Sequence, residues 1–230
     1  MLHIHPTAPL ADRVLLPGDP GRALRLAQSL LDGPRMFNHN RGLWGYTGTA
    51  PDGEPLTIQS TGMGGPSAAI VVSELADLGA TRLLRVGTCG ALDPGLALGE
   101  LLLATEAIAA DGTSRALGAR DRVLADPALV ARLPEPRRAT VVSTDLFYDV
   151  RPEVEQRWMA DGAEAVEMET ATLYTLAARR GLQAAALLIV SDTLRPARAR
   201  IDADGLVAAE QRMGAAAVAA LATPTATAPS

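Results

Sequence analysis

Short apolar runs of strand length alternate along the chain with longer segments in which apolar residues recur at helical spacing. The short runs are rich in leucine, isoleucine and valine, and turn residues bound most of them. We expect strands over 13–16, 55–61, 82–87, 99–105, 139–144 and 184–190. We expect helices over about 22–31, 170–180 and 204–222, and one more that begins in the turn at 62–67 and ends at residue 78. The run over 184–190 is uninterrupted, which is typical of a strand that is covered on both faces.

This alternation predicts an α/β protein in which helices cover both faces of a largely parallel β-sheet. The chain has no internal repeat and no linker long enough to divide it, so we expect one domain over 1–222. The Pro- and Ala-rich tail over 223–230 is expected to be disordered. Because ligands of such folds bind beyond the carboxyl ends of the strands, the residues that follow each strand are the candidates for a site.

Composition and charge favour a globular protein that does not bind nucleic acids. With 230 residues, 48% of them apolar, the chain can bury a full α/β core. Acidic residues outnumber basic ones by 26 to 21, which argues against a general nucleic-acid binder and leaves small anionic ligands open. The chain lacks an apolar run near the ~20 residues that cross a bilayer, and its start does not resemble a secretory signal. We therefore expect a soluble, cytoplasmic protein.

Metal binding is not indicated by the cysteine and histidine content. Cys89 is the single cysteine, so a disulfide within the chain and a Cys-rich metal site are both excluded. His3, His5 and His39 lack helical spacing and an acidic companion. We expect no metal site.

The first two strands end in glycine-rich turns. Gly18 and Gly21 would let a ligand approach the backbone, and Arg22 stands at the start of a helix, whose N-terminus favours anions. The turn over 60–69 contains three glycines and three hydroxyl residues and is also compatible with an anion. Ordinary tight turns use the same residues, so neither turn is specific by itself.

The third strand carries a more informative residue. Arg85 lies among Leu83, Leu84 and Val86 and is followed at once by Gly87 and Thr88. A guanidinium is almost never buried without a partner, because desolvation costs several kcal/mol. A structural ion pair would explain Arg85, but the glycine-rich surroundings favour a phosphate or carboxylate held by Arg85 and Thr88.

Two glutamates flank Met168 before the helix over 170–180. If the segment through Glu169 is extended, Glu167 and Glu169 point the same way. Acidic residues near a helix N-terminus complement its dipole, which explains Glu169 better than Glu167. The alternative is a pair of carboxylates that accept hydrogen bonds from a polyol.

Polar residues also follow the strand over 184–190. Ser191 and Asp192 stand where catalytic groups are often found, although an N-cap is an equally good explanation. Arg41, in a turn-rich segment near Trp44 and Tyr46, suggests a surface that docks onto a second subunit.

Seven motifs occur in the order found in bacterial purine nucleoside phosphorylases, of the purine nucleoside and uridine phosphorylase superfamily. They are LLPGDPGRA, NRGLWGYTGT, TGMGGPSAAIVVSEL, LLRVGTCGAL, STDLFY, VEMETATLYTLA and VSD, within residues 3–192. This resemblance implies a single-domain, three-layer α/β/α sandwich with a central mixed sheet, assembled as a hexamer built from dimers. It implies reversible phosphorolysis of purine ribo- or deoxyribonucleosides in purine salvage, with inorganic phosphate as co-substrate and without metal or cofactor.

The resemblance also implies roles for individual residues. Phosphate would be bound by Gly18, Arg22, Arg85 and Thr88, with Arg41 reaching it from the neighbouring subunit. The nucleoside would be bound by Phe147, Val166, Glu167, Met168, Glu169 and Ser191, with His3 arriving from the neighbour near the 5′-hydroxyl. Asp192 would protonate the departing purine, and Arg212 is the expected partner of Asp192, with Arg195, Arg198 and Arg200 as alternatives.

Three other functions compete with this one. A uridine phosphorylase would use an amide and an arginine after the FY motif, and the chain offers Arg151 without a suitable glutamine. A nucleosidase of the same fold would attack with water and lack the phosphate-binding arginines. A nucleoside-binding protein without activity would not need Glu169 and Asp192 together.

Overall fold

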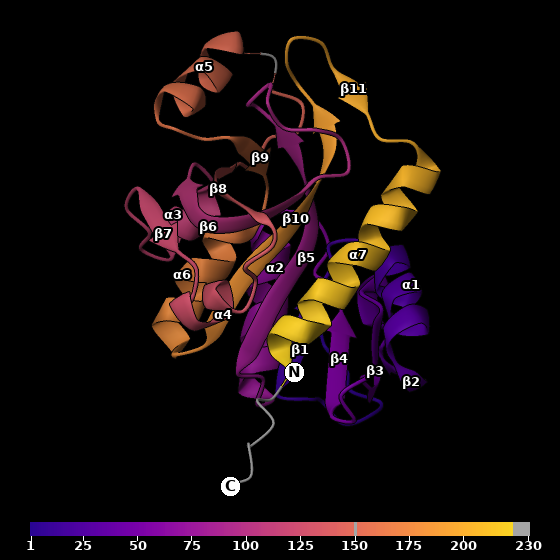
Figure 1. Ribbon diagram of the computed structural model, residues 1–230. Helices are drawn as coiled ribbons and strands as arrows, with labels where there is room; N and C mark the ends of the chain where they lie inside the picture. Colours follow the sequence, from indigo (N-terminus) through magenta and orange to yellow (C-terminus); the bar gives the residue numbers. More distant parts are fainter. Residues whose placement is uncertain (150, 223–230) are drawn as a thin grey trace, which may run out of the picture.

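The computed structural model describes residues 1–149 and 151–222, and the expected disordered tail lies outside the described residues. The helices are α1 (Pro20–Leu30), α2 (Gly65–Asp77), α3 (Gly112–Ala116), α4 (Pro127–Ala131), α5 (Pro152–Ala160), α6 (Thr170–Arg180), α7 (Ala203–Leu221) and the 3₁₀ turn η1 (Asn40–Gly42). The strands are β1 (Arg13–Leu16), β2 (Asp32–Asn38), β3 (Gly45–Thr49), β4 (Pro55–Gln59), β5 (Arg82–Ala91), β6 (Leu101–Ala109), β7 (Arg122–Leu124), β8 (Arg137–Ser143), β9 (Ala165–Glu167), β10 (Gln183–Thr193) and β11 (Ala199–Arg200). These strands form one sheet (Figure 1).

The sheet consists of two parallel blocks joined by antiparallel pairs. In the first block, β4, β1, β5 and β10 lie side by side, and in the second, β6, β8 and β9 do. Antiparallel pairs join the blocks twice, β10 to β6 and β5 to β9. Because both junctions form, β5, β9, β8, β6 and β10 close into a ring, while β3 and β2 extend the sheet beyond β4.

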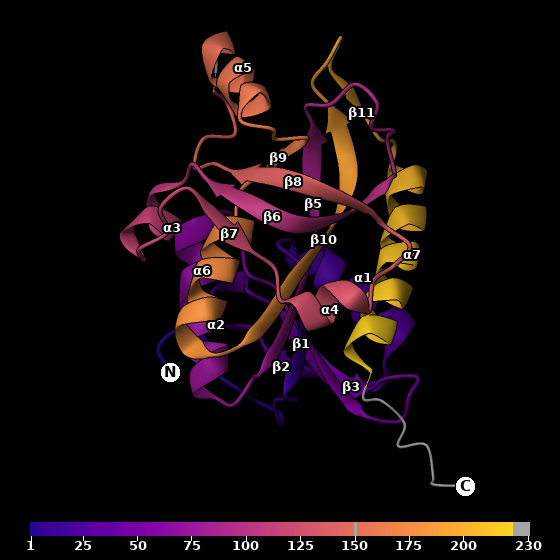
Figure 2. The ribbon, with the colours of Figure 1, turned by 60° about the vertical axis from the view of Figure 1, so that its left-hand side comes forward.

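Helices cover both faces of the sheet. On one side α2, α3 and α6 pack together, and on the other α1 packs against α7 (Figures 1 and 2). The expected α/β sandwich with a mixed sheet is confirmed, and the apolar run over 184–190 is buried between the two helical layers. The closed ring of strands was not expected from the sequence pattern.

Cap residues define the helices that border the site. The side chain of Asp19 accepts hydrogen bonds from the backbone N–H groups of Gly21 and Arg22, at 3.0 and 2.8 Å, and Pro20 opens α1. Helix α6 ends at Gly181, whose φ of 66° lies in the left-handed region that favours glycine. Pro20 at the start of α1 and Glu169 before α6 lie around the same cavity as Thr88 of β5.

Strands β2 and β3 form a hairpin where the sequence suggested a turn-rich segment around Arg41, Trp44 and Tyr46. Only 40–42 form a turn, in which Arg41 has a φ of 57°. The first five residues of β2 are exposed, and they include Gly33 and Pro34. An exposed edge strand of this composition carries no hydrophobic alternation, so no sequence pattern indicated it.

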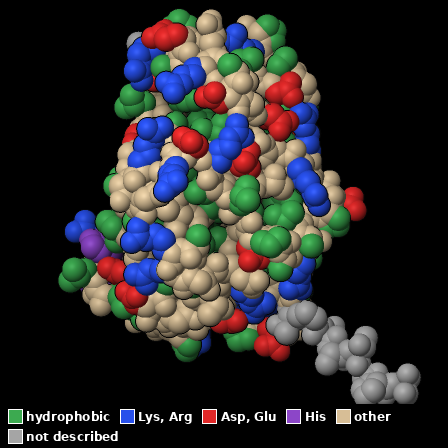
Figure 3. Space-filling view, turned by 90° about the vertical axis from the view of Figure 1, so that its left-hand side faces the viewer, with side chains coloured by type: hydrophobic (Ala, Val, Ile, Leu, Met, Phe, Trp, Pro, Cys, Tyr) green, Lys and Arg blue, Asp and Glu red, His purple; other side chains and the backbone are tan. Residues whose placement is uncertain are grey.

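The face of the molecule seen in Figure 3 carries basic and acidic side chains interspersed with apolar ones. No continuous basic surface runs across this face, as expected for a chain with a formal charge of −5. Within 1–149 and 151–222, no helix has the length and apolar character needed to span a bilayer.

Candidate active site

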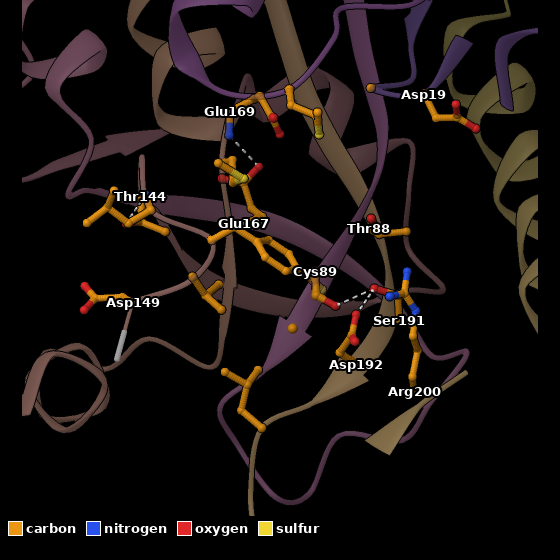
Figure 4. Close-up of a pocket in the computed structure, with 18 of the residues that line it drawn as sticks. Asp19, Thr88, Cys89, Thr144, Asp149, Glu167, Glu169, Ser191, Asp192 and Arg200 are labelled. Carbon is orange, nitrogen blue, oxygen red and sulfur yellow. Dashed lines mark hydrogen bonds between the residues drawn. The ribbon is translucent and has the colours of Figure 1, made fainter. Parts of the chain in front are cut away.

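A cavity of about 560 Å³ lies at the carboxyl end of β1 and against the C-terminal parts of β5 and β10, bordered by β9 and the start of α6 (Figure 4). It is large enough for a small organic ligand. Most residues predicted for the site line this cavity: Gly18, Arg22, Arg85, Thr88, Phe147, Val166, Glu167, Met168, Glu169, Ser191 and Asp192. Three do not line it, namely His3, Arg41 and Arg212.

The loops after β1 and β4 touch at one end of the cavity. The N–H of Gly62 donates to the carbonyl oxygen of Gly18 over 3.1 Å. A Cβ at Gly18 would lie 3.2 Å from the Gly62 carbonyl oxygen, and Gly62 itself has a φ of 73°. Both positions therefore favour glycine, and the pairing holds the two loops beside the N-terminus of α1.

Arg22 lies in the first turn of α1 and is buried. Its Nε donates to Glu210 of α7 over 2.7 Å, and its Nη1 donates to the carbonyl oxygen of Val86 over 3.4 Å. The guanidinium is thus tied both to the facing helix and to β5, next to the predicted phosphate-binding residues.

Arg85 occupies the centre of the cavity wall, with only 5% of its surface exposed. Its Nε donates to Glu167 over 3.1 Å, and its Nη2 forms an ion pair with Glu169. Burial lowers the pKa of Arg85, but the carboxylates of Glu169 and Glu167 outweigh burial and raise the pKa above its ordinary value. Among the described residues none accepts a hydrogen bond from the buried Nη1 atom, which leaves one donor group for a ligand.

Glu167, and not Glu169, caps helix α6. The Glu167 carboxylate accepts from the N–H groups of Glu169 and Thr170 at about 2.9 Å and from the Ser143 hydroxyl. Glu169 occupies the N-cap position but its side chain makes no capping bond. The helix-dipole explanation considered from the sequence suited Glu169 better than Glu167, whereas in the structure Glu167 makes the capping hydrogen bonds. Both carboxylates do point the same way, since both contact Arg85.

The Glu169 carboxylate faces the cavity beside Met168. It accepts from the backbone N–H of Gly64 and pairs with Arg85. Burial raises the pKa of Glu169 and Glu167 adds to this effect, so the pKa lies above its ordinary value although Arg85 opposes the shift. A carboxyl group in this position can accept hydrogen bonds from the hydroxyl groups of a ligand.

Ser191 and Asp192 end β10 on the opposite side of the cavity (Figure 4). The Ser191 hydroxyl contacts Asp192 Oδ2 at 2.9 Å and the Cys89 carbonyl oxygen at 3.3 Å. Both side chains are buried, and neither caps a helix. The N-cap explanation for these two residues is therefore wrong, because the chain continues into β11 instead of a helix.

The arginine that meets Asp192 comes from the β10–β11 hairpin. Arg198 Nη2 lies 3.9 Å from Asp192 Oδ1, and Arg200 stands opposite Asp192 in the antiparallel pairing. Arg212 instead donates to the carbonyl oxygen of Gly99, away from the cavity. The expectation that Arg212 partners Asp192 is therefore corrected, because α7 directs Arg212 toward the loop before β6.

Phe147 and Val166 border the same end of the cavity. Phe147 is 55% exposed, and the Arg198 guanidinium lies 5.6 Å from its ring centre. This cation–π contact joins the loop after β8 to the β10–β11 hairpin across the mouth of the cavity.

His3 and Arg41 lie outside the cavity of their own chain. His3 Nδ1 contacts Glu74 of α2 at 2.8 Å, and Arg41 is exposed in η1. Their predicted contribution to a neighbouring subunit's site stays a prediction.

Several cavity residues were not predicted. Thr144 lies within the STDLFY motif but was given no role, and Trp158 lies outside the seven motifs. Glu210 is the most consequential of the missed residues near the cavity, since it binds Arg22. An acidic residue in the middle of an Ala-rich helix was the available signal. Within the described residues, no cluster of three or more His, Cys, Asp or Glu side chains could hold a metal ion.

The chain is similar in sequence to known proteins. The family model described as the phosphorylase superfamily matches residues 12–224. A purine nucleoside phosphorylase of the DeoD type from Caldanaerobacter subterraneus subsp. tengcongensis is 40% identical over 197 residues, which cover 80% of this chain and 84% of the relative. A protein of the same name from Geobacillus kaustophilus is 41% identical, with 81% and 83% covered.

Solved structures are also similar. A uridine phosphorylase from Vibrio fischeri ES114 superposes with a TM-score of 0.82 at 29% identity, covering 92% of each chain. The family resemblance indicated by the seven motifs is confirmed. The chain belongs to the phosphorylase superfamily, in which it groups with the DeoD-type purine nucleoside phosphorylases.

Proposed function

We propose that this protein is a pentosyltransferase that cleaves purine ribo- or deoxyribonucleosides with inorganic phosphate, releasing the free base and the pentose 1-phosphate. One observation carries the proposal: two buried arginines, Arg22 and Arg85, line one end of a cavity whose other end holds Asp192. An anion and a base can therefore bind on opposite sides of a pentose. The relatives named purine nucleoside phosphorylase support the same reaction.

Phosphate binds at the end formed by Gly18, Arg22, Arg85 and Thr88. The Nη1 of Arg85, which has no acceptor among the described residues, supplies a hydrogen-bond donor there. A phosphate oxygen attacks the anomeric carbon as the glycosidic C–N bond breaks, and the positive charge that develops on the pentose is balanced by the phosphate itself.

The pentose lies against Met168 with its hydroxyl groups toward Glu169. Arg85 fixes the Glu169 carboxylate, so the same guanidinium contacts the anion site and orients the group that holds the sugar. This shared contact keeps nucleophile and anomeric carbon in one relative geometry, which lowers the entropic barrier of the reaction.

The electron pair of the broken bond passes to the purine, whose imidazole nitrogen takes a proton from Asp192. In this step Asp192 acts as the general acid toward the departing base. The side chain is buried beside Ser191, and Arg198 approaches it to 3.9 Å. Phe147 and Val166 border the base.

The active assembly is a hexamer, a trimer of dimers, in which His3 and Arg41 complete the neighbour's site. Their location outside their own cavity supports this arrangement, because both lie on the N-terminal part of the chain away from Asp192. The reaction needs no metal and no organic cofactor, and its place in the cell is the cytoplasm.

A uridine phosphorylase is the second candidate, favoured by the structural similarity to the Vibrio fischeri enzyme. Asp192 and the higher identity to purine-specific relatives favour purines. A nucleosidase, which would use water, does not need both buried arginines.

Incubation with inosine, adenosine, guanosine and uridine, each with and without phosphate, tests the proposal. We expect purine release only with phosphate, together with one pentose 1-phosphate per base. Phosphate-independent cleavage of inosine would favour the nucleosidase, and cleavage of uridine alone would favour the pyrimidine enzyme. Binding without turnover would leave a nucleoside-binding protein.

A further inference from the structure

Glu210 on α7 is a buried carboxylate that lies outside the predicted site but contacts it. Only 2% of its surface is exposed, and its two oxygens are occupied by arginines of α1. Oε1 accepts from Arg22 Nε over 2.7 Å and from Arg25 Nη2 over 2.9 Å, and Oε2 accepts from Arg25 Nε over 2.8 Å. The two arginines are one helical turn apart, so a single carboxylate can meet both.

The hydrogen bonds of Arg22 divide its guanidinium into a held edge and an open edge. Nε is occupied by Glu210, and Nη1 donates to the Val86 carbonyl oxygen over 3.4 Å. Among the described residues none accepts a hydrogen bond from Nη2, and Arg22 lines the cavity. An arginine side chain has four rotatable bonds, and these two contacts at different ends of the guanidinium fix its plane.

Glu210 keeps its negative charge in this setting. Burial raises its pKa, but the hydrogen bonds from Arg25 and Arg22 outweigh burial and bring the pKa below its ordinary value. The Arg25 side chain is 44% exposed and also approaches Asp19 at 3.6 Å. Glu210 is thus paired with a buried arginine on one side and with a partly exposed arginine on the other. The carboxylate is therefore anchored on both sides.

Arg85, the other arginine of the proposed phosphate site, is held in the same way. Arg85 Nε donates to the buried carboxylate of Glu167 over 3.1 Å, and its Nη1 atom is left without a partner among the described residues. In both cases a carboxylate holds the Nε side, and a nitrogen at the far end of the guanidinium remains available.

We propose that Glu210 is a positioning residue for the anion site, which holds Arg22 by its Nε edge so that the open edge binds phosphate. This inference rests on the proposed function in that phosphate is the ligand. Glu210 does not touch the reacting atoms, and it acts through Arg22 alone. Without the Glu210 charge, the Arg22 guanidinium loses its counter-ion, which by itself would favour phosphate binding. It also becomes free to rotate away from the site, and we expect this loss of orientation to dominate and to weaken phosphate binding.

Glu210→Gln tests the proposal, because glutamine keeps the volume and one acceptor oxygen but loses the charge. We expect the Kd of orthophosphate measured by calorimetry, and the KM for phosphate, to rise about tenfold or more. The KM for inosine at saturating phosphate and the kcat should change less than about threefold. Glu210→Asp, which is too short to meet both arginines, serves as the second variant if Glu210→Gln does not fold.

Arg25→Gln is the matched control, since it removes the outer arginine and keeps the Arg22–Glu210 contact. It should change the KM for phosphate by less than about threefold. In an Arg22→Ala background, Glu210→Gln should add no further loss, because the two residues act as one unit.

The proposal is overturned if Glu210→Gln binds phosphate as tightly as the unmodified protein or more tightly. It is also overturned if kcat, both KM values and the melting temperature all deteriorate together, as for a merely structural residue. Calorimetry separates this inference from the proposed function. A protein whose phosphate affinity depends on Glu210 and Arg22 but that releases no base would contradict the function alone. Normal phosphorolysis by Glu210→Gln would contradict the inference alone.

Discussion

Arg85 and Glu167 form a buried ion pair, in which Nε donates to Oε2 over 3.1 Å and the side chains are 6% and 0% exposed. The same carboxylate accepts from the first N–H groups of α6 and from Ser143. One side chain thus connects the start of a helix, strand β8 and the central arginine of the cavity. Because its oxygens are occupied by protein donors, Glu167 positions other groups and has little capacity left for a nucleoside.

Glu167→Ala should therefore reduce both stability and phosphate binding. The substitution leaves the Arg85 charge buried with one fewer counter-ion and uncaps α6, which we expect to lower the free energy of unfolding by about 3–5 kcal/mol. Urea denaturation followed by circular dichroism measures this loss. Arg157→Ala, which removes an exposed pair with Asp161 at 3.9 Å, is the control and should leave the midpoint unchanged. Equal midpoints for all three proteins would contradict the assigned role.

The sequence was sufficient for the parts of the fold that follow local patterns. The run over 184–190 became the centre of β10, because a strand between two helical layers is apolar throughout. Asp32–Asn38 gave no such pattern, since an edge strand with exposed residues need not alternate. The ring closed by β10 and β5 depends on pairings between strands about a hundred residues apart, which no local pattern encodes.

The same distinction applies to the site. Arg85 was found because a charge in an apolar strand is costly and needs a partner. The identity of its partners, Glu167 and Glu169, and the pairing of Arg22 with Glu210 were not predicted, because each joins residues far apart in the chain. Arg212 was misplaced for a related reason. Its distance from Asp192 depends on the rotation of α7 about its axis. The helical pattern does not determine whether Arg212 or an arginine of the β10–β11 hairpin faces the cavity.

The effect of substitution on catalytic activity distinguishes Arg198, in the β10–β11 hairpin, from Arg212, in α7. Arg198 lies 3.9 Å from Asp192, whereas Arg212 donates to the carbonyl oxygen of Gly99. We expect Arg198→Ala to lower kcat/KM for inosine by about tenfold or more, because it removes the cation nearest to the base-side carboxylate. Arg212→Ala should retain activity within about threefold. The reverse order would show that α7 moves to bring Arg212 to Asp192 during turnover.

Asp192→Asn should slow adenosine phosphorolysis severely, by about 10²- to 10⁴-fold in kcat, since an amide does not supply the proton that the departing base requires. 7-Methylguanosine provides the internal control. Its purine is already cationic and leaves without protonation, so the variant should cleave it with a much smaller loss. An equal loss for both nucleosides would indicate that Asp192 binds the base and does not act as an acid.

Glu74 of α2 anchors the N-terminal segment. Its carboxylate accepts from the N–H groups of Leu2, His3 and Ile4 at 2.8–3.2 Å and from His3 Nδ1 at 2.8 Å. Burial raises the pKa of Glu74, but these hydrogen bonds outweigh burial and lower the pKa from 4.5 to about 2. The folded protein therefore keeps the carboxylate charged at a pH where the unfolded chain is protonated.

This difference gives stability a defined dependence on pH. Because the unfolded state binds more protons between about pH 4.5 and 2, the contribution of Glu74 is complete above pH 4.5 and is lost as the pH falls through about 2. The melting temperature of the unmodified protein should consequently fall more steeply over this interval than that of Glu74→Gln, whose amide does not titrate. Glu153→Gln, at an exposed position of α5, should keep the steeper slope. Parallel curves for the unmodified protein and Glu74→Gln would mean that Glu74 does not hold the N-terminal segment, and His3 would then have no fixed direction toward a neighbouring subunit.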